Sequence, residues 1–394
     1  MVGRVPAHPA PSVMMGSMGT SGDPGRAPLG PGYAARLPEP TGPSAVGTTS
    51  LYLKDVSRAD PWAAGMDARE LMVSLWYPAA PSDRPRARYM TPAESELQLT
   101  SRGITGVRPD ALSMVRVNAI SDAAPAGRQH GLPLVVLSPG FTNPRSTLTA
   151  LAEDLASHDY VVAGIDHTYE SFATAFPDGR VTTCLAREAP RRGREFWAKV
   201  VAGRAADVSF VLDELTGPSP AWPGAGLIDP SRMAMAGHSV GGAAAIAALL
   251  ADSRLRAGID LDGATSTPIP DRGLSRPVFL VGKQSSYTPG SGGAVTAWER
   301  DWKLLTGWKR WLVVAGAVHA SFTDLGLLAD QIGIDTGAAL SGARSLDITR
   351  AYVRACFDEH LRSRPPAMLD RSTPSYPEVT FCSPEQAPGR DPTC

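Results

Sequence analysis

Short apolar strands alternate with helices from residue 132 to residue 361, and this alternation constrains the fold more than any other feature of the sequence. Most of the strands are continuous apolar runs, which is typical of strands that are covered on both faces. The pattern therefore predicts an α/β fold with a mostly parallel central sheet and helices on both faces. The predicted strands are 132–137, 160–165, 233–236, 257–262, 278–281 and 311–314, and the predicted helices are 146–158, 191–215 and 345–361.

The rest of the chain divides around this core. Residues 48–54 and 71–76 are strand-like and predict an antiparallel hairpin at the N-terminal end of the domain, followed by an irregular stretch, 79–131, with a helix at 93–101. We predict one domain over residues 41–363, where these patterns lie. The hydrophobic fraction of 43% in the 394-residue chain is enough for a substantial core. Residues 1–40 are rich in Pro and Gly and predict a disordered segment, and 364–394 predict a Pro-rich tail that wraps the surface or hangs free.

The bulk properties exclude several classes of partner. A net charge of −1 gives no electrostatic reason to bind nucleic acid. No apolar run approaches the ~20 residues that span a bilayer. The N-terminus lacks the pattern of a signal peptide, which favours a cytoplasmic protein without excluding secretion. Oligomeric state is left open.

The four cysteines show no metal-ligand spacing, and no cofactor or metal is expected. Cys382 and Cys394 are placed to pair across the tail. Inside a cell, unpaired thiols are the more usual state.

Residues 237–242, Gly-His-Ser-Val-Gly-Gly, contain the pattern Gly-x-Ser-x-Gly between the strand 233–236 and an Ala-rich helical run. In this setting the pattern predicts a sharp turn that exposes the hydroxyl of Ser239. A side chain at Gly237 or Gly241 would collide with the neighbouring strand or helix. A chance match in a chain with 39 glycines is the alternative, and the flanking strand and helix argue against it.

A serine hydroxyl becomes a good nucleophile when a histidine takes its proton and an acid orients that histidine. In the α/β-hydrolase arrangement the acid and then the histidine follow the serine along the chain. Of seven histidines, His319 and His360 follow Ser239. His360 lies near the end of the last predicted helix, where a solvated or dipole-stabilising role is usual. His319, in a loop after the strand 311–314, is the predicted base.

Several carboxylates compete for the role of the acid. Asp260 and Asp262 end the strand 257–262 and are expected on the same face of it. Asp262 is favoured because it stands where the strand gives way to a loop, whereas Asp260 lies deeper and suits a structural role. Asp271 and Asp324, in predicted loops, are weaker candidates.

Attack by a serine hydroxyl on a carbonyl group also needs N–H donors for the oxyanion that forms. The backbone N–H of Val240, which follows the serine, is one candidate. The loop 138–142 leaves the strand 132–137, and Gly140 permits a tight turn there that presents the N–H of Phe141 as the second candidate. An ordinary Pro-Gly turn is the alternative for this loop.

Five blocks of the sequence together resemble the platelet-activating-factor acetylhydrolases of type II and of plasma. They are 133–141, 164–171, 237–242, 258–263 and 318–324, and the resemblance extends over about residues 45–363. It implies an α/β-hydrolase fold with Ser239 as nucleophile, Asp262 as acid and His319 as base. It also implies Phe141 and Val240 as oxyanion donors.

The sequence departs from that family at two positions of the site. Pro139 stands where the family has a histidine, and Asp260 stands where the family usually has a small residue. Bacterial cutinases and polyester hydrolases have similar Gly-His-Ser-x-Gly-Gly and Leu-Asp-Gly-Ala stretches. The chain thus resembles a bacterial relative of both groups.

The resemblance implies a serine esterase that acts through an acyl-enzyme on short-chain esters, with acetylated phospholipids among the substrates to consider. A cutinase-like lipase is the alternative, and a non-catalytic hydrolase-fold binding protein ranks lower because all three triad positions are occupied. A peptidase of the prolyl-oligopeptidase class is disfavoured, because no large added domain is present. The expected partner is a small-molecule ester or a lipid.

Two segments, 168–193 and 265–311, have the positions to cover the site, but neither is long enough for a large lid. We therefore expect an open site for short acyl groups. Trp298 and Trp302 would share a helix face with Leu305. Core packing is the usual reason for such a stripe, and an acyl-binding wall is the alternative.

Overall fold

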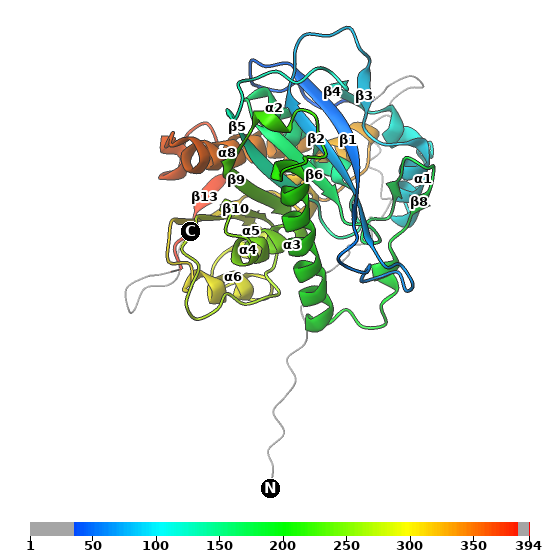
Figure 1. Cartoon of the computed structure of the whole chain (residues 1–394). Helices are drawn as coiled ribbons and strands as arrows, with labels where there is room; N and C mark the ends of the chain where they lie inside the picture. The colour runs from blue at the N-terminus through cyan, green and yellow to red at the C-terminus, as the bar shows by residue number, and fades with distance from the viewer. Residues whose placement is uncertain (1–34, 385–393) are drawn as a thin grey trace, which may run out of the picture.

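A sheet of 11 strands forms the centre of the computed structural model, which describes residues 35–384 and Cys394. Its strand order is β13-β12-β11-β10-β9-β5-β6-β2-β1-β4-β3 (Figure 1). The strands from β6 to β12 in this order pair in parallel, so the mostly parallel sheet is confirmed. They are β5 (Leu132–Ser138), β6 (Val161–Asp166), β9 (Ile228–His238), β10 (Leu255–Leu261), β11 (Val278–Lys283) and β12 (Lys309–Val314).

The N-terminal hairpin is also present. Strands β1 (Val46–Asp55) and β2 (Arg69–Pro78) pair antiparallel, and β2 joins the parallel strands through antiparallel pairing with β6. The stretch 79–131 holds the expected helix, α1 (Pro92–Ser101), but also two strands that the sequence did not indicate. These are β3 (Arg86–Arg88), the edge strand, and β4 (Arg116–Ser121) beside it; both mix polar with apolar residues and contain no long apolar run.

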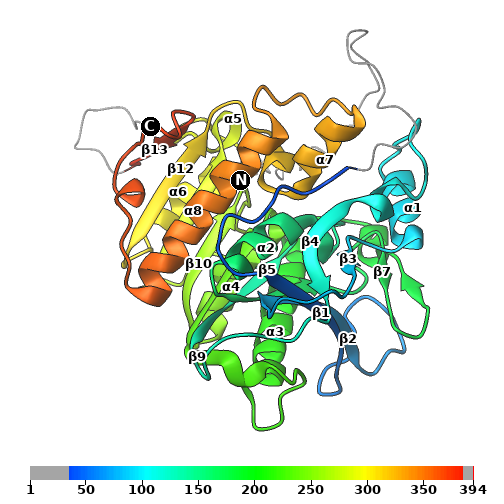
Figure 2. The ribbon, with the colours of Figure 1, turned by 90° about the horizontal axis from the view of Figure 1, so that it is seen from above.

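Helices cover both faces of the sheet, as predicted. On one face, α3 (Arg194–Thr216), α4 (Val240–Ala251) and α6 (Val295–Trp302) pack in a cluster that includes Leu134 and Val136. On the other face, α2 (Thr149–Ser157) and α8 (Gly342–Arg362) pack in a cluster that includes Val135 and Leu137. Alternate residues of β5 thus pack into the two clusters on opposite faces of the sheet. Figure 2 shows α8 crossing the strands on its face.

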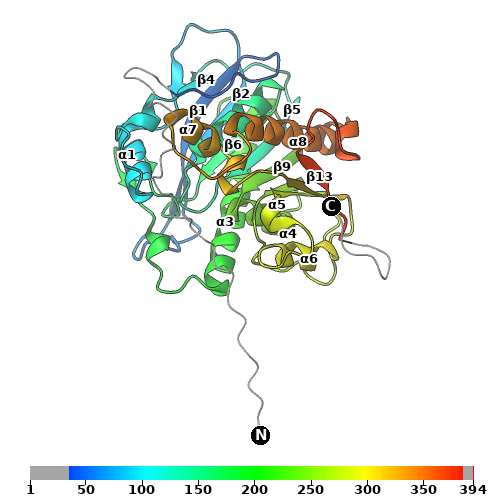
Figure 3. The same ribbon diagram turned by 180° about the vertical axis from the view of Figure 1, so that it is seen from behind.

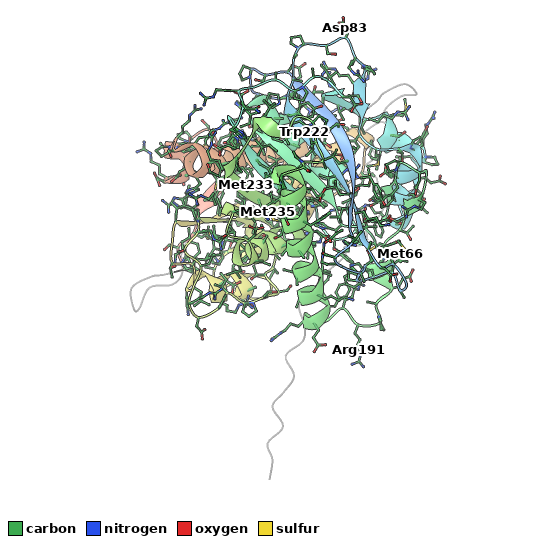
Figure 4. The ribbon with its side chains drawn as sticks, viewed as in Figure 1. Met66, Asp83, Arg191, Trp222, Met233 and Met235 are labelled. Atoms are coloured by element: carbon green, nitrogen blue, oxygen red, sulfur yellow. A yellow bond between two sulfur atoms is a disulfide. The ribbon has the colours of Figure 1, made fainter. Side chains whose placement is uncertain are left out.

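Strand β9 lies in the middle of this arrangement. Figure 4 shows Met233 and Met235 on β9 beside α3 in the interior, while Asp83 and Arg191 lie at the periphery. Both methionine side chains are fully buried in the cluster under α3 and α4. The turn that carries Ser239, which we call the serine elbow, therefore follows a strand that is buried on both faces.

A helix that the sequence did not predict, α7 (Asp324–Ile332), packs beside α8 (Figure 3). The remaining short elements are α5 (Gln284–Tyr287), β7 (Thr174–Ala175), β8 (Val181–Thr182), η1 (Ala111–Met114), η2 (Arg145–Leu148), η3 (Leu185–Glu188), η4 (Ala225–Leu227), η5 (His319–Phe322) and η6 (Ala367–Leu369). In the part of the chain that the structure describes, none of the helices has both the length and the apolar character of a membrane span.

The two predicted flanking segments lie only partly within the described residues. Of the N-terminal segment, 1–34 lie outside them, while Ala35 and Leu37 are buried and Leu37 N–H donates to the Arg116 carbonyl at 2.9 Å. Of the tail, 385–393 lie outside. Residues Val379–Phe381 form β13, which pairs antiparallel with β12, so this part of the tail extends the sheet. A disulfide joins Cys382 to Cys394.

Candidate active site

The candidate nucleophile, Ser239, stands at the tip of β9 where α4 begins. Its backbone has φ 58° and ψ −125°, a conformation that an L-residue adopts only when its surroundings impose it. Its N–H donates to the Leu261 carbonyl at 2.8 Å, which fastens the turn to the neighbouring strand β10. The sequence pattern and the observed strand–turn–helix geometry agree.

The two glycines of the motif are required by close backbone contacts. A Cβ on Gly237 would lie 2.2 Å from the Gly241 carbonyl oxygen, and one on Gly241 would lie 2.1 Å from the Ser138 carbonyl oxygen. Both distances are far below van der Waals contact. The predicted collisions with a helix start and with a strand are therefore confirmed.

His319 and Asp262 are brought together from two different strand ends. His319 opens the short helix η5 after β12, and Asp262 directly follows β10. The His319 Nδ1 lies 2.5 Å from Asp262 Oδ2, and the other carboxylate oxygen accepts the Lys283 N–H at 2.8 Å. The Asp262 side chain is only 1% exposed and that of His319 is 46% exposed, so a buried carboxylate holds a solvent-accessible imidazole.

Both residues lie beside the elbow. A Cβ on Gly263, next to Asp262, would meet the Ser239 carbonyl oxygen at 2.1 Å. The ring of His238, next to the serine, lies 4.5 Å from the ring of His319, and its Nε2–H donates to the His319 carbonyl at 2.8 Å. Burial and the neighbouring His319 lower the pKa of His238 well below its ordinary value, so its ring is a neutral support.

Asp260, the main competitor for the role of the acid, points elsewhere. Its Oδ1 accepts the Gly263 N–H at 2.8 Å, and the carboxyl lies against Gly242 at the start of α4. Burial raises its pKa well above the ordinary value, which favours a neutral structural acid. The expectation that both aspartates share a face assumed a strand to residue 262, but β10 ends at Leu261 and Asp262 has φ 59°.

Asp271, Asp324 and His360, the weaker candidates for acid and base, have structural surroundings of their own. Asp271 is exposed in a loop, and the buried Asp324 accepts the Ala150 N–H at the start of α7. His360 packs its ring 4.4 Å from that of Trp308. Burial and Arg310 lower the pKa of His360 to about 4, so it is uncharged at neutral pH and does not stabilise the helix dipole as a cation.

The candidate oxyanion loop, residues 138–142, leaves β5 next to the elbow. A Cβ on Gly140 would lie 3.3 Å from the Ser239 Cβ, so this glycine lets the loop approach the serine. Thr142 has φ 71°, which is rare for a β-branched residue. Within the described residues, the N–H groups of Phe141 and Val240 make no hydrogen bond to another protein group.

Aromatic side chains border this loop. The rings of Phe141, Phe196 and Trp197 pack against one another edge to face, with centroids 4.9–5.8 Å apart. Phe172 and Cys184, from the segment 168–193, join the same cluster beside Val240. The first of the two segments near the site therefore contributes an apolar wall.

The second segment contributes core instead. Trp298 is fully buried and donates its indole N–H to the Gly263 carbonyl at 2.6 Å, and Trp302 packs near Trp311. The interpretation of the tryptophan stripe as core packing is confirmed. Trp298 also supports the loop that carries Asp262.

Sequence reasoning missed the buried support of the oxyanion loop. Arg204 of α3 is 1% exposed and donates to Ser138 Oγ at 3.1 Å and to the Pro139 carbonyl. An arginine in an amphipathic helix ordinarily indicates a solvated face, so the sequence offered no signal. Within the described residues, no cluster of three or more His, Cys, Asp or Glu side chains is suited to a metal ion.

The fold and the elbow define the class: a serine hydrolase with the α/β-hydrolase fold. The family model of platelet-activating factor acetylhydrolase, isoform II, matches residues 32–201 and 225–351, and the chain belongs to this family. It is a hydrolase of carboxylic ester bonds, as its relatives are.

Three relatives illustrate the range of this group. The solved structure of a ferulic acid esterase from Streptomyces cinnamoneus is 42% identical with a TM-score of 0.79, covering 89% of this chain and 99% of that one. A probable 1-alkyl-2-acetylglycerophosphocholine esterase from Arthroderma benhamiae is 28% identical over 88% of this chain and 93% of its own length. A bis(hydroxyethyl) terephthalate hydrolase from Streptomyces coelicolor is 29% identical over 46% of this chain and 50% of its own.

Proposed function

We propose that Ser239, His319 and Asp262 form the catalytic triad of this esterase. The observation that carries the proposal is the 2.5 Å contact between His319 Nδ1 and Asp262 Oδ2 beside the Ser239 elbow. This contact fixes the imidazole so that Nε2 is left to take a proton from a hydroxyl. The exposed imidazole also gives a substrate access.

In the proposed reaction, His319 takes the Ser239 proton as the hydroxyl attacks the ester carbonyl. The N–H groups of Phe141 and Val240 hold the oxyanion, and the Asp262 carboxylate stabilises the imidazolium. His319 then protonates the leaving alcohol. It next activates a water molecule that releases the acid and restores the serine.

We propose short acyl esters as the substrates. The segment 168–193 contributes an apolar wall, and the tryptophans of the segment 265–311 pack in the core. The His319 side chain is 46% exposed, so neither segment closes over it. With 4-nitrophenyl esters, hydrolysis should be fastest for acetate and fall steadily as the acyl chain lengthens. A preference for long chains would argue against this substrate class.

An aromatic ester is the second candidate. Phe141, Phe196 and Trp197 offer ring edges and faces next to the oxyanion loop, and aromatic pairs gain about 0.5–1.5 kcal/mol beyond their buried area. A ferulic acid esterase is among the similar proteins. Methyl ferulate, an acetylated phospholipid and a peptide amide, assayed side by side with 4-nitrophenyl acetate, distinguish the candidates.

The triad is tested by replacement and by labelling. Ser239→Ala should abolish turnover with the melting temperature unchanged, and Asp262→Asn should lower kcat about 10,000-fold through the wrong histidine tautomer. His360→Gln, a histidine replacement on α8, is the matched control and should keep its activity. Failure of a fluorophosphonate to label the wild-type protein would argue against Ser239 as the activated nucleophile.

A further inference from the structure

We propose that Arg204, oriented by Glu170, is a positioning residue for the oxyanion loop, residues 138–142. This inference rests on the proposed function, because it concerns the loop that presents the Phe141 N–H. The Arg204 guanidinium donates to Ser138 Oγ at 3.1 Å, to the Pro139 carbonyl and to Glu170 Oε2 at 2.7 Å. One buried side chain of α3 therefore binds the first two residues of the loop.

Glu170 extends the support to the end of the same loop. Its backbone carbonyl accepts the Thr142 N–H at 2.7 Å, and the Thr142 carbonyl accepts the Phe172 N–H at 3.0 Å. These two bonds hold Thr142 at φ 71°. The other Glu170 carboxylate oxygen accepts the indole N–H of Trp62 at 2.9 Å. Arg204 and Glu170 thus connect the two ends of the loop through their own ion pair.

The peptide unit that carries the Phe141 N–H lies between these two anchors. Its carbonyl, on Gly140, accepts the Asn143 N–H at 3.1 Å. The direction of the Phe141 N–H therefore depends on the bonds that hold residues 138–142. Among them are the bonds from Arg204 to Ser138 and Pro139. An oxyanion donor is effective only when it already points to the place where charge develops.

A second layer of buried polar groups keeps Arg204 in place. His167 lies between Ser138 Oγ and Asp207, with both contacts at 2.9 Å. Asp207 in turn binds Arg69, and both side chains are at most 1% exposed. Burial and the charge of Arg204 lower the pKa of His167, so the ring is neutral.

This neutral ring fixes the polarity of the hydrogen bonds. Its Nδ1–H donates to the Asp207 carboxylate, so its Nε2 accepts the proton of the Ser138 hydroxyl. The hydroxyl oxygen is then left to accept from Arg204. Removal of Arg204 would leave the Ser138 hydroxyl bound to His167 alone and the buried Pro139 carbonyl without its side-chain donor.

A role in stability alone predicts a different outcome from a positioning role. An unanchored loop should bind a substrate in its ground state nearly as well, but should bind the tetrahedral intermediate less well. A positioning role therefore lowers kcat with little change in KM. It also weakens a trifluoromethyl ketone inhibitor, which mimics the tetrahedral intermediate, by a similar factor.

The experiment compares Arg204→Met with Arg350→Met. Arg350 is a comparably buried arginine, 5% exposed, and its ion pair with Asp154 lies on the other face of the sheet. Fluorophosphonate titration first counts the active sites, so that rates are expressed per reactive serine. We expect Arg204→Met to lower kcat by about 100-fold, in the range of a lost or misplaced donor. The inhibitor should weaken in parallel, and neither change should occur in Arg350→Met.

Glu170→Gln is the second variant, because it keeps the shape and the backbone carbonyl at 170 but removes the charge that orients Arg204. Glu170→Gln should also lower kcat, by about 10-fold. It tests the proposal even where Arg204→Met does not fold. If either variant, Arg204→Met or Glu170→Gln, folds and keeps the wild-type kcat and inhibitor affinity, the proposal is overturned. Failure of the wild-type protein to react with the fluorophosphonate would instead overturn the proposed function itself.

Discussion

At the scale of single residues, the site depends on close backbone contacts that leave room for glycine alone. Gly237 and Gly241 were expected to be glycine because of collisions, and the structure gives the atoms with which a Cβ would collide. The choice between Asp260 and Asp262 depends on where β10 ends. No sequence pattern reports that the backbone turns to a positive φ at Asp262.

Gly241→Ala should therefore inactivate the enzyme. The new Cβ would lie 2.1 Å from the Ser138 carbonyl oxygen, so either the elbow or the start of the oxyanion loop must move. Because a shift of about 1 Å can cost about 100-fold in rate, we expect kcat to fall at least that far. Steady-state kinetics and thermal unfolding measure the effect.

Gly203→Ala is the matched control. Gly203 lies in the middle of α3 with open space where its Cβ would be, so alanine should raise the stability by up to about 1 kcal/mol through its helix propensity. Activity should be unchanged. An active Gly241→Ala variant would mean that the elbow tolerates displacement.

At the scale of elements, long apolar strands and the long helices were predictable, whereas short polar elements were not. Strand β4 mixes polar and apolar residues beside the edge strand β3, and β13 has three residues. Their existence depends on pairing with β1 and β12, which are distant in sequence. Local propensity carries little of that information.

The C-terminal strand is stabilised by a covalent link. The disulfide Cys382–Cys394 spans 12 residues and starts one residue after β13. By the loop-entropy estimate such a link contributes up to about 3 kcal/mol. Cys394→Ser should lower the unfolding temperature and speed amide exchange in Val379–Phe381, with kcat unchanged because β13 lies at the sheet edge. Equal exchange rates with and without dithiothreitol would show that the link does not hold the strand.

At the scale of the whole molecule, the site is a product of topology. Ser239, Asp262, His319 and the loop 138–142 follow β9, β10, β12 and β5, whose carboxyl ends meet at one edge of the parallel sheet. The order of the motifs along the chain made this meeting predictable. The buried support beneath the loop was not predictable, because Arg204, His167 and Asp207 come together only when α3 packs on the sheet.

The whole fold should also lose stability below neutral pH through His360. Its ordinary pKa is 6.5, and burial against Trp308 with Arg310 nearby lowers it to about 4 in the folded protein. Between these two values the unfolded chain binds the proton and the folded chain does not, so stability falls as pH decreases from 6.5 to 4.

His360→Phe keeps a ring for the contact with Trp308 and removes the titration. The difference in melting temperature between variant and wild type should therefore grow in favour of the variant as the pH is lowered from 7 to 4, because only the wild type loses stability by protonating this ring. The same difference at pH 8, where both rings are neutral, measures the change in packing alone. Since His360 is partly exposed, solvent reduces the size of the effect but not its sign. A melting-temperature difference that stays constant from pH 8 to pH 4 would show that His360 does not couple stability to pH.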